Sequence, residues 1–142
     1  MDGTFVSDTL RTRMPRPRQT FTGEFEAPLR RRGGDEVLLR LPAAWRAPGH
    51  CGADFLAVAI EGGIRIYSPQ GTERLLRKAN RLNKDDEQVR LALRRVFGNA
   101  CQVPCDETHT LAFDETFIRS TRLGTTARLI GHTHYFEISP LE

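Results

Sequence analysis

Arg30, Arg31 and Arg32 stand directly before Gly33 and Gly34 in the sequence. Guanidinium groups donate several hydrogen bonds in one plane, so arginine binds phosphate oxygens and the edge of guanine well. Two glycines among charged residues are typical of a tight turn. We therefore expect the three guanidinium groups on a protruding turn, where they contact DNA or, alternatively, are simply solvated.

Arg40 and Arg46 are secondary candidates for DNA contact. Arg40 lies between two apolar residues of a predicted strand, so a carboxylate at the sheet surface is an alternative partner for it. Apart from Lys78 and Lys84, every basic residue other than histidine is arginine. That bias suits phosphate and guanine recognition, but the composition of a GC-rich genome explains it equally well.

A second constellation consists of cysteine and histidine. Cys101, Cys105, His109, His132 and His134 are residue types that bind zinc. The two last histidines alternate along a predicted strand, which would direct both side chains to one side. The spacing of the cysteines is poor for zinc and no second paired motif follows, so we predict no metal site and no cofactor.

Catalytic motifs are missing from the sequence. There is no phosphate-binding loop, no Gly-x-Ser-x-Gly and no His-Glu-x-x-His. Asp106 and Asp114 stand beside predicted turns, where capping of backbone N–H groups explains them. We therefore do not expect an enzyme.

Composition sets the broad class. The formal net charge of +3 permits binding to nucleic acid without demanding it. The three cysteines are too few and odd in number for a disulfide framework, which fits a reducing compartment. No apolar run is long enough to span a membrane, and the N-terminus has no apolar signal region. We expect a cytoplasmic protein with no membrane partner.

The elements that must position these residues begin after a basic arm, residues 1–20. In residues 21–69 we predict a strand at 21–26, a turn, a strand at 37–41, a short helix at 42–46 and a hairpin of 55–60 with 64–67. Residues 70–97 form a predicted helical linker with two apolar stripes. Leu93 and Phe97 of its second helix are expected to be core residues, and Gly98 to end that helix.

The plan of the first half recurs in residues 98–142. A strand start at 101–103, a turn, a strand at 110–113, a short helix at 115–119 and a hairpin of 128–130 with 135–138 occur in the same order. Phe117 corresponds to Trp45 in the short helix. Each half is too small for its own core, so we predict an α+β fold in which both halves share one core.

In this arrangement the chain resembles the MraZ family of bacterial transcription regulators. The resemblance rests on Phe21-Thr22-Gly23, on Pro42-Ala43-Ala44-Trp45-Arg46, on Tyr67-Ser68-Pro69, and on the second half that comes after a helical linker. It implies two pseudo-repeated, AbrB-like swapped-hairpin β-barrel halves and a ring-like homo-oligomer. It also implies binding to promoter DNA through basic residues near the hairpin turns, and hence association with the nucleoid.

The sequence departs from the family at the residues expected to matter. The family carries Asp-x-x-x-Arg in each half, and the matching positions here are Gly34 and Leu38, then Asp106 and Thr110. Neither motif is intact, and the first turn is longer than usual and contains the three arginines. We interpret this as a move of the charge from the strand into the turn, while loss of specific DNA binding is the alternative.

The sequence therefore favours a homo-oligomeric DNA-binding regulator that binds through Arg30 to Arg32, with Arg40 and Arg46 secondary. The first rival is a diverged MraZ-like scaffold that assembles without reading DNA. The second rival is a small metal-dependent enzyme that uses the cysteine and histidine residues.

Overall fold

The computed structural model describes residues 21–82 and 84–141, and within them it has the mixed α+β composition that was predicted. The predicted arm, residues 1–20, lies outside the described residues. In chain order the strands and helices are β1 (Glu24–Pro28), β2 (Arg30–Arg32), β3 (Glu36–Arg40), the 3-10 helices η1 (Ala43–Trp45) and η2 (Pro48–His50), β4 (Asp54–Ile60), β5 (Gly63–Tyr67), α2 (Pro69–Asn80), α3 (Glu87–Gly98), β6 (Ala100–Pro104), β7 (Thr110–Asp114), α4 (Glu115–Arg119), β8 (Thr126–Gly131) and β9 (Tyr135–Pro140).

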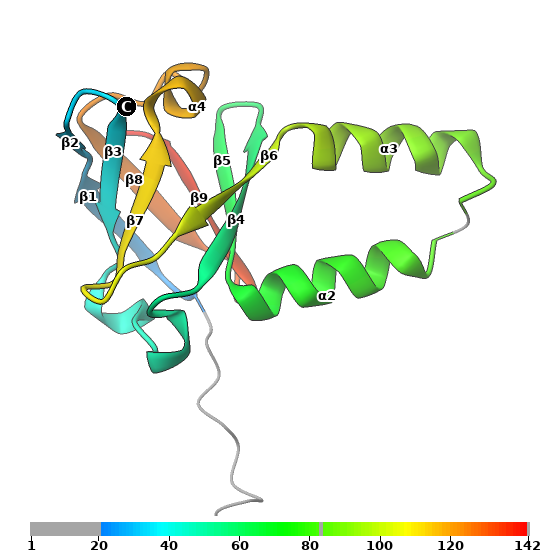
Figure 1. Ribbon diagram of the computed structural model, residues 1–142, viewed down its shortest axis with the longest axis horizontal. Helices are drawn as coiled ribbons and strands as arrows, with labels where there is room; N and C mark the ends of the chain where they lie inside the picture. The colour runs from blue at the N-terminus through cyan, green and yellow to red at the C-terminus, as the bar shows by residue number, and fades with distance from the viewer. Residues whose placement is uncertain (1–20, 83, 142) are drawn as a thin grey trace, which may run out of the picture.

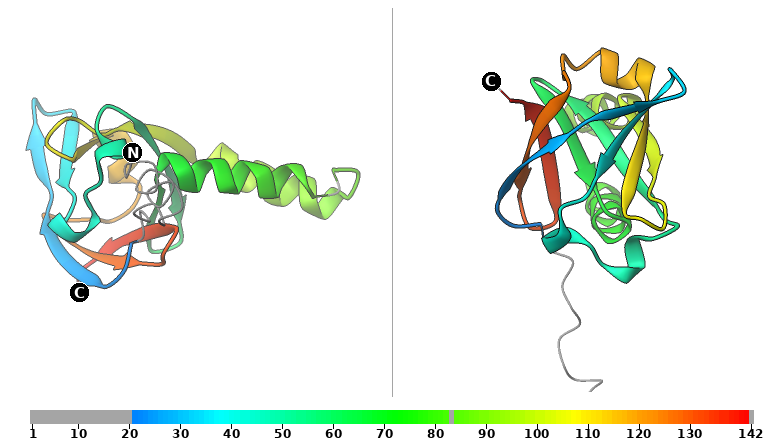
Figure 2. Two further views of the ribbon diagram at one scale, coloured as in Figure 1. Left: turned by 90° about the horizontal axis from the view of Figure 1, so that it is seen from below. Right: turned by 90° about the vertical axis from the view of Figure 1, so that its left-hand side faces the viewer.

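The strands form two antiparallel sheets that wrap around one interior (Figure 1, and Figure 2, right). The larger sheet has six strands in the order β1-β8-β9-β5-β4-β6, and the smaller has the order β2-β3-β7. Each sheet mixes strands from before and after the helical linker. In the larger sheet β1 pairs with β8 and β6 pairs with β4, so the first strand of each half joins the hairpin of the other.

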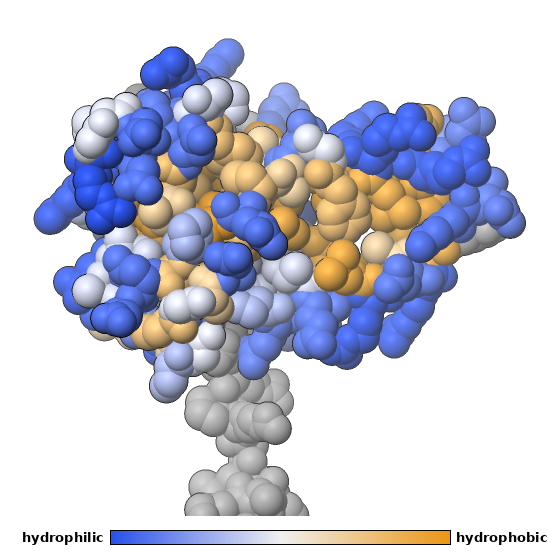
Figure 3. All heavy atoms as spheres, viewed as in Figure 1, coloured by the Kyte–Doolittle hydropathy of each residue, from blue (hydrophilic) through white to orange (hydrophobic). Residues whose placement is uncertain are grey.

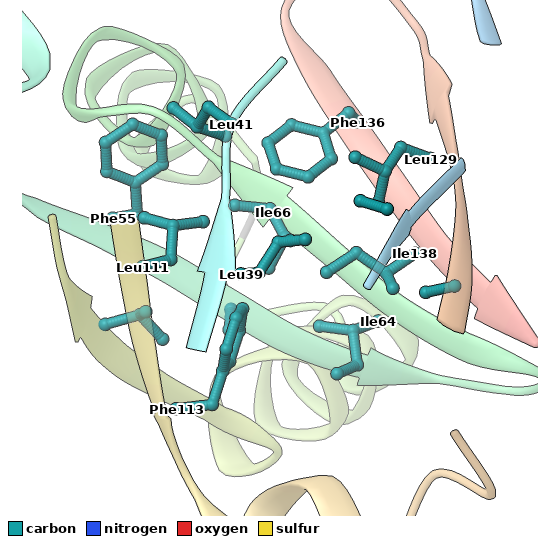
Figure 4. Packing of buried hydrophobic residues seen from close by; sticks show 14 of the residues in the cluster. Leu39, Leu41, Phe55, Ile64, Ile66, Leu111, Phe113, Leu129, Phe136 and Ile138 are labelled. Atoms are coloured by element: carbon teal, nitrogen blue, oxygen red, sulfur yellow. The ribbon is translucent and has the colours of Figure 1, made fainter. Parts of the chain in front are cut away.

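Alternation along the strands builds the core, because successive side chains of a strand point to opposite faces. Leu39 of β3 and Phe113 of β7 come from the small sheet, whereas Ile66, Leu129 and Phe136 come from the large one, and all five are at most 1% exposed. Figure 4 shows these side chains gathered in a single interior. The core is therefore common to both halves of the chain.

Trp45 closes one end of this core. Its ring packs at about 5 Å, centroid to centroid, against Phe21, Phe25 and Phe136. Its indole N–H donates to the carbonyl oxygen of Thr22 at 2.8 Å. This bond satisfies the one polar group of a side chain that is only 3% exposed. The short η1 helix thus anchors the β3–β4 connection to the start of β1.

Helices α2 and α3 project away from the sheets as a pair (Figure 1, and Figure 2, left). Ser68 caps α2 by accepting from the backbone N–H of Gly71, and Asp86 caps α3 by accepting from that of Gln88. Helix α3 ends at Gly98, as predicted, but none of its residues is buried.

The prediction that Leu93 and Phe97 are core residues is wrong for the single chain. Leu93 is only half-buried and Phe97 is 36% exposed, because α3 lies beyond the reach of the core formed by the two sheets. The space-filling view shows apolar residues gathered between the two helices (Figure 3). The apolar stripes of α2 and α3 are thus partly exposed to solvent in the single chain.

Candidate nucleic-acid interface

The arginine run is an edge strand rather than the turn that was predicted. Arg30, Arg31 and Arg32 pair antiparallel with β3, so β2 is the outer strand of the small sheet. The turn comes directly after the run, at Gly33 and Gly34, whose positive φ angles of 67° and 86° suit glycine. The arginine run forms a strand because its backbone pairs with that of β3. This pairing does not depend on the identity of the arginine side chains.

The three guanidinium groups have different partners. Arg31 Nε donates to Glu115 Oε1 at 3.1 Å, at the start of α4. Arg32 forms an exposed ion pair with Glu36, with 2.8 Å between Nη2 and Oε1. No partner of Arg30 is found among residues 21–82 and 84–141. Arg30, which has no partner among the described residues, and Arg32, whose ion pair is exposed and weak, therefore occupy alternate positions along the edge strand.

Arg30 and Arg32 point to the same side of the β2–β3 ribbon. They lie opposite Leu38 and Glu36, whose side chains face away from the core, as the buried Val37 between them shows. The edge of the three-stranded sheet thus presents Arg30 and Arg32 on its outer face, next to a glycine turn, and we call this edge the β2–β3 ribbon.

Arg40 lies on the same outer face of the small sheet as Arg30 and Arg32, because Leu38 and Arg40 alternate along β3 with the buried Leu39. It is two residues from Leu38, the partner of Arg30, at the end of β3 away from the glycine turn. Its Nε donates to the carbonyl oxygen of Thr108 at 3.2 Å, rather than to the carboxylate considered as an alternative. Arg40 therefore ties β3 to the turn before β7.

Arg46 lies apart from β2. It comes directly after η1, and its Nε donates to the carbonyl oxygen of Leu41 at 2.9 Å, which folds the side chain back on its own loop. The residue is half-buried beside Trp45. Of the five predicted arginines, the structure thus places Arg30, Arg32 and Arg40 on one face of the small sheet, whereas Arg31 faces Glu115 and Arg46 lies apart.

The positions that match the family's Asp-x-x-x-Arg motif have local roles. Asp106 accepts from the hydroxyl of Thr108 at 2.7 Å and from the backbone N–H groups of Thr108 and Thr110. These bonds lower the pKa of Asp106. Gly34 is in the β2–β3 turn and Leu38 pairs with Arg30.

The predicted capping role of the aspartates is confirmed. Asp106 closes the turn before β7 through the bonds just described. Asp114 is the N-cap of α4 and accepts from the backbone N–H of Thr116 at 2.8 Å. Both carboxylates therefore serve the backbone.

The cysteine and histidine residues do not converge. His132 and His134 lie in the β8–β9 connection, so the prediction that both belong to a strand is wrong. Instead, His109 lies beside Cys51, with 3.4 Å between Nε2 and Sγ. Within the described part of the chain, no three side chains of histidine, cysteine, aspartate or glutamate are grouped to hold a metal ion.

A basic groove beside α2 was not predicted from the sequence. Its helical wall carries Arg74, Arg77, Lys78 and Arg81, and the strands β5 and β9 form the opposite wall. The signal was present, since these four residues recur at the i, i+3, i+4, i+7 spacing of one helix face. It was not recognised because exposed cations commonly occupy the polar face of a helix whose other face is apolar.

The sequence matches no protein-family model and no curated protein. Among the described residues, no helix is long and apolar enough to cross a membrane. The function must therefore be inferred from the geometry of the chain itself.

Proposed function

We propose that this protein is a homo-oligomeric, DNA-binding transcription regulator of the MraZ type, associated with the nucleoid. The observation that carries the proposal is the β2–β3 ribbon, with Arg30 and Arg32 on its outer face beside the turn at Gly33 and Gly34. Exposed arginines at the edge of a sheet can reach the phosphates and the base edges in the major groove of duplex DNA.

The chemistry of the ribbon suits a duplex better than a single small anion. Arg30 is free of partners among the described residues, and the Arg32–Glu36 pair is exposed and can open at little cost. Arginine side chains on a ribbon contact phosphates for affinity and guanine edges for sequence preference. Arg31 is left to hold β2 against Glu115 of α4.

The pairing of strands supports two AbrB-like swapped-hairpin halves. The backbone N–H of Gly131 donates to Gly23 at 2.9 Å where β8 of the second half meets the start of the first. The N–H of Ala59 donates to Asn99 at 3.0 Å where β4 of the first half meets the start of the second. Equivalent bonds in the two halves are expected of a repeated unit whose hairpins exchange first strands.

A second pair of backbone hydrogen bonds is also equivalent in the two halves, and it shows where the halves begin to differ. Leu29 donates to Thr125 at 2.8 Å, and Cys105 donates to Ala53 at 2.9 Å. After Cys105 the chain turns at once into β7, whereas after Leu29 it inserts β2 before β3. The arginine strand is therefore the feature that distinguishes the first half, which agrees with charge having moved into a lengthened connection.

Self-association is supported by the helical pair. Leu76 and Leu82 of the α2 segment are 46% and 45% exposed, and Phe97 of α3 is 36% exposed. Apolar side chains on paired helices are covered most simply by an identical helical pair from a second copy, which buries the same stripes again.

A scaffold without specific DNA binding is the second candidate. It is favoured by the ion pairs of Arg31 and Arg32 and by the purely local contacts of Asp106 and Thr110. The metal-dependent enzyme receives no support from the described residues, since their histidines and cysteines form no group of ligands.

Binding of labelled duplex DNA at several salt concentrations tests the proposal. The variant Arg30→Ala/Arg32→Ala should bind at least about tenfold more weakly, and its salt slope should fall by about 0.9 for each phosphate that is no longer bound. Arg31 stays unchanged because of its bond to Glu115. Light scattering should give an unchanged oligomer.

The matched control is Arg94→Ala/Arg95→Ala, which removes two exposed cations from α3. Lysine at positions 30 and 32 should restore phosphate contacts but not guanine preference. Equal DNA affinity of the Arg30→Ala/Arg32→Ala variant and the control would reject β2 as the interface.

A further inference from the structure

The groove beside α2 is a concave site of about 510 Å³. Such a volume is in the range of pockets for small ligands. Helix α2, which forms one wall of the groove, lies on the far side of the sheets from β2 (Figure 1). It is therefore separate from the proposed DNA interface, and binding of a ligand there does not depend on binding of DNA.

The helical wall carries a surplus of positive charge. Arg77 forms a highly exposed pair with Glu73, with 3.4 Å between Nη2 and Oε1. For Arg74, Lys78 and Arg81 no carboxylate lies within ion-pair distance among residues 21–82 and 84–141. Like charges at i, i+4 on a helix repel, so an anion bound in the groove would relieve this repulsion.

The side chains of the opposite wall already contact one another. Two nitrogens of Arg65 donate to Glu137 Oε2 at 3.1 and 2.9 Å. The guanidinium of Arg65 also lies 4.7 Å from the ring centroid of Tyr135. Tyr135 stacks on His132 and packs against Tyr67 as well, at 4.9 and 5.3 Å between ring centroids.

These contacts decide the chemical class of the ligand. Arg65 lies over the ring of Tyr135 and His132 stacks on it, so the π contacts of this ring are already made within the protein. The open hydrogen-bond donors come from Arg74, Lys78 and Arg81. The guanidinium group of arginine can donate two parallel hydrogen bonds to phosphate oxygens. The three residues span about 10 Å along the helix, which is enough for several linked phosphates.

We propose that the groove between α2 and the β5–β9 wall binds the oligophosphate portion of a small ligand. The cations of α2 hold the phosphates, and the Arg65–Tyr135–Tyr67 wall limits the depth of the site. The rest of the ligand projects into solvent.

Calorimetric titration of the full chain with sodium tripolyphosphate tests the proposal. The wild-type protein should show saturable binding. Lys78→Ala/Arg81→Ala should weaken it at least about tenfold, because charge-assisted hydrogen bonds are lost. Both side chains are exposed and alanine favours helix, so thermal unfolding should be unchanged.

The matched control is Arg94→Ala/Arg95→Ala on α3, which should bind tripolyphosphate within about twofold of wild type. Arg30→Ala/Arg32→Ala should also bind it normally, even if DNA binding is lost or never existed. Duplex DNA affinity should be unaffected by Lys78→Ala/Arg81→Ala.

Three results would overturn the proposal. They are the absence of saturable binding in wild type, an equal loss in the α3 control, and a parallel loss of duplex DNA affinity in Lys78→Ala/Arg81→Ala. The last result would make the groove part of a DNA backbone surface.

Discussion

At the residue scale, neighbouring arginines of β2 differ because strand geometry sends them to opposite faces. Arg31 faces the side of Glu115, and Arg30 and Arg32 face solvent. Residue type suggested the chemistry of the site from sequence alone. The division of roles could not be predicted, because it depends on Glu115, which is distant in the chain and is brought close only by the β3–β7 pairing.

His50 is the most unusual polar side chain of the core. It is fully buried beside Phe21 and Phe55, and neither ring nitrogen has a hydrogen-bond partner among the described residues. Burial, with a smaller contribution from the charge of His109, lowers the pKa of His50 from 6.5 to about 4. The folded protein therefore holds a neutral imidazole at pH values where the unfolded chain is protonated.

This difference predicts an acid-dependent loss of stability. Between pH 6.5 and pH 4 the unfolded state binds the proton first, so the free energy of unfolding falls as the pH is lowered through this window. The contribution should be about 2 kcal/mol at pH 5 relative to pH 8. Urea unfolding followed at several pH values measures it.

His50→Phe provides the comparison, because a phenyl ring fits between the same aromatic neighbours and does not titrate. The variant should lose that part of the pH dependence while the carboxylate contributions remain. An identical slope between pH 6.5 and pH 4 in both proteins would show that His50 is not the responsible group.

At the scale of elements, apolar runs bounded by turn residues were the reliable signal. The hairpins β4–β5 and β8–β9 were predicted because apolar residues run along them and turns separate them. Strand β2 was missed because three arginines carry no alternation, and pairing with β3 alone makes them a strand. The apolar stripes of α2 and α3 were found, but periodicity does not say what covers a stripe.

The exposed stripe on α2 predicts an assembly interface. If a second copy covers it, Leu76→Gln should raise the dissociation constant of the oligomer at least about tenfold, since burying a leucine stabilises by about 1.5–3 kcal/mol. Light scattering across a dilution series measures the mass. Unfolding of the sheets should hardly change, because Leu76 is 46% exposed.

Leu91→Gln is the matched control. Leu91 is 42% exposed but lies about 200° around α3 from Val89, away from the stripe. Its substitution should leave the mass unchanged. A monomer for the wild-type protein at micromolar concentration, or equal effects of both substitutions, would contradict the assignment of this stripe to self-association.

At the scale of the whole molecule, the chain has two basic regions on opposite sides of the sheets. We propose the β2–β3 ribbon as the site for duplex DNA and the groove beside α2 as the site for a small anion, and β2 and α2 lie on opposite sides of the sheets (Figure 1). The groove could not be located from sequence, because its opposite wall joins β5 of the first half to β9 of the second. In an oligomer built on the helical pair, the ribbon would be presented several times, which raises avidity for repeated sites.

Selection of host genomic fragments on the purified wild-type protein is the decisive test of sequence-specific DNA binding. We expect the recovered fragments to share a short motif, present more than once per fragment. The Arg30→Ala/Arg32→Ala variant should no longer enrich them. Recovery of fragments without any sequence preference by the wild-type protein would contradict sequence-specific binding and leave the scaffold as the better description.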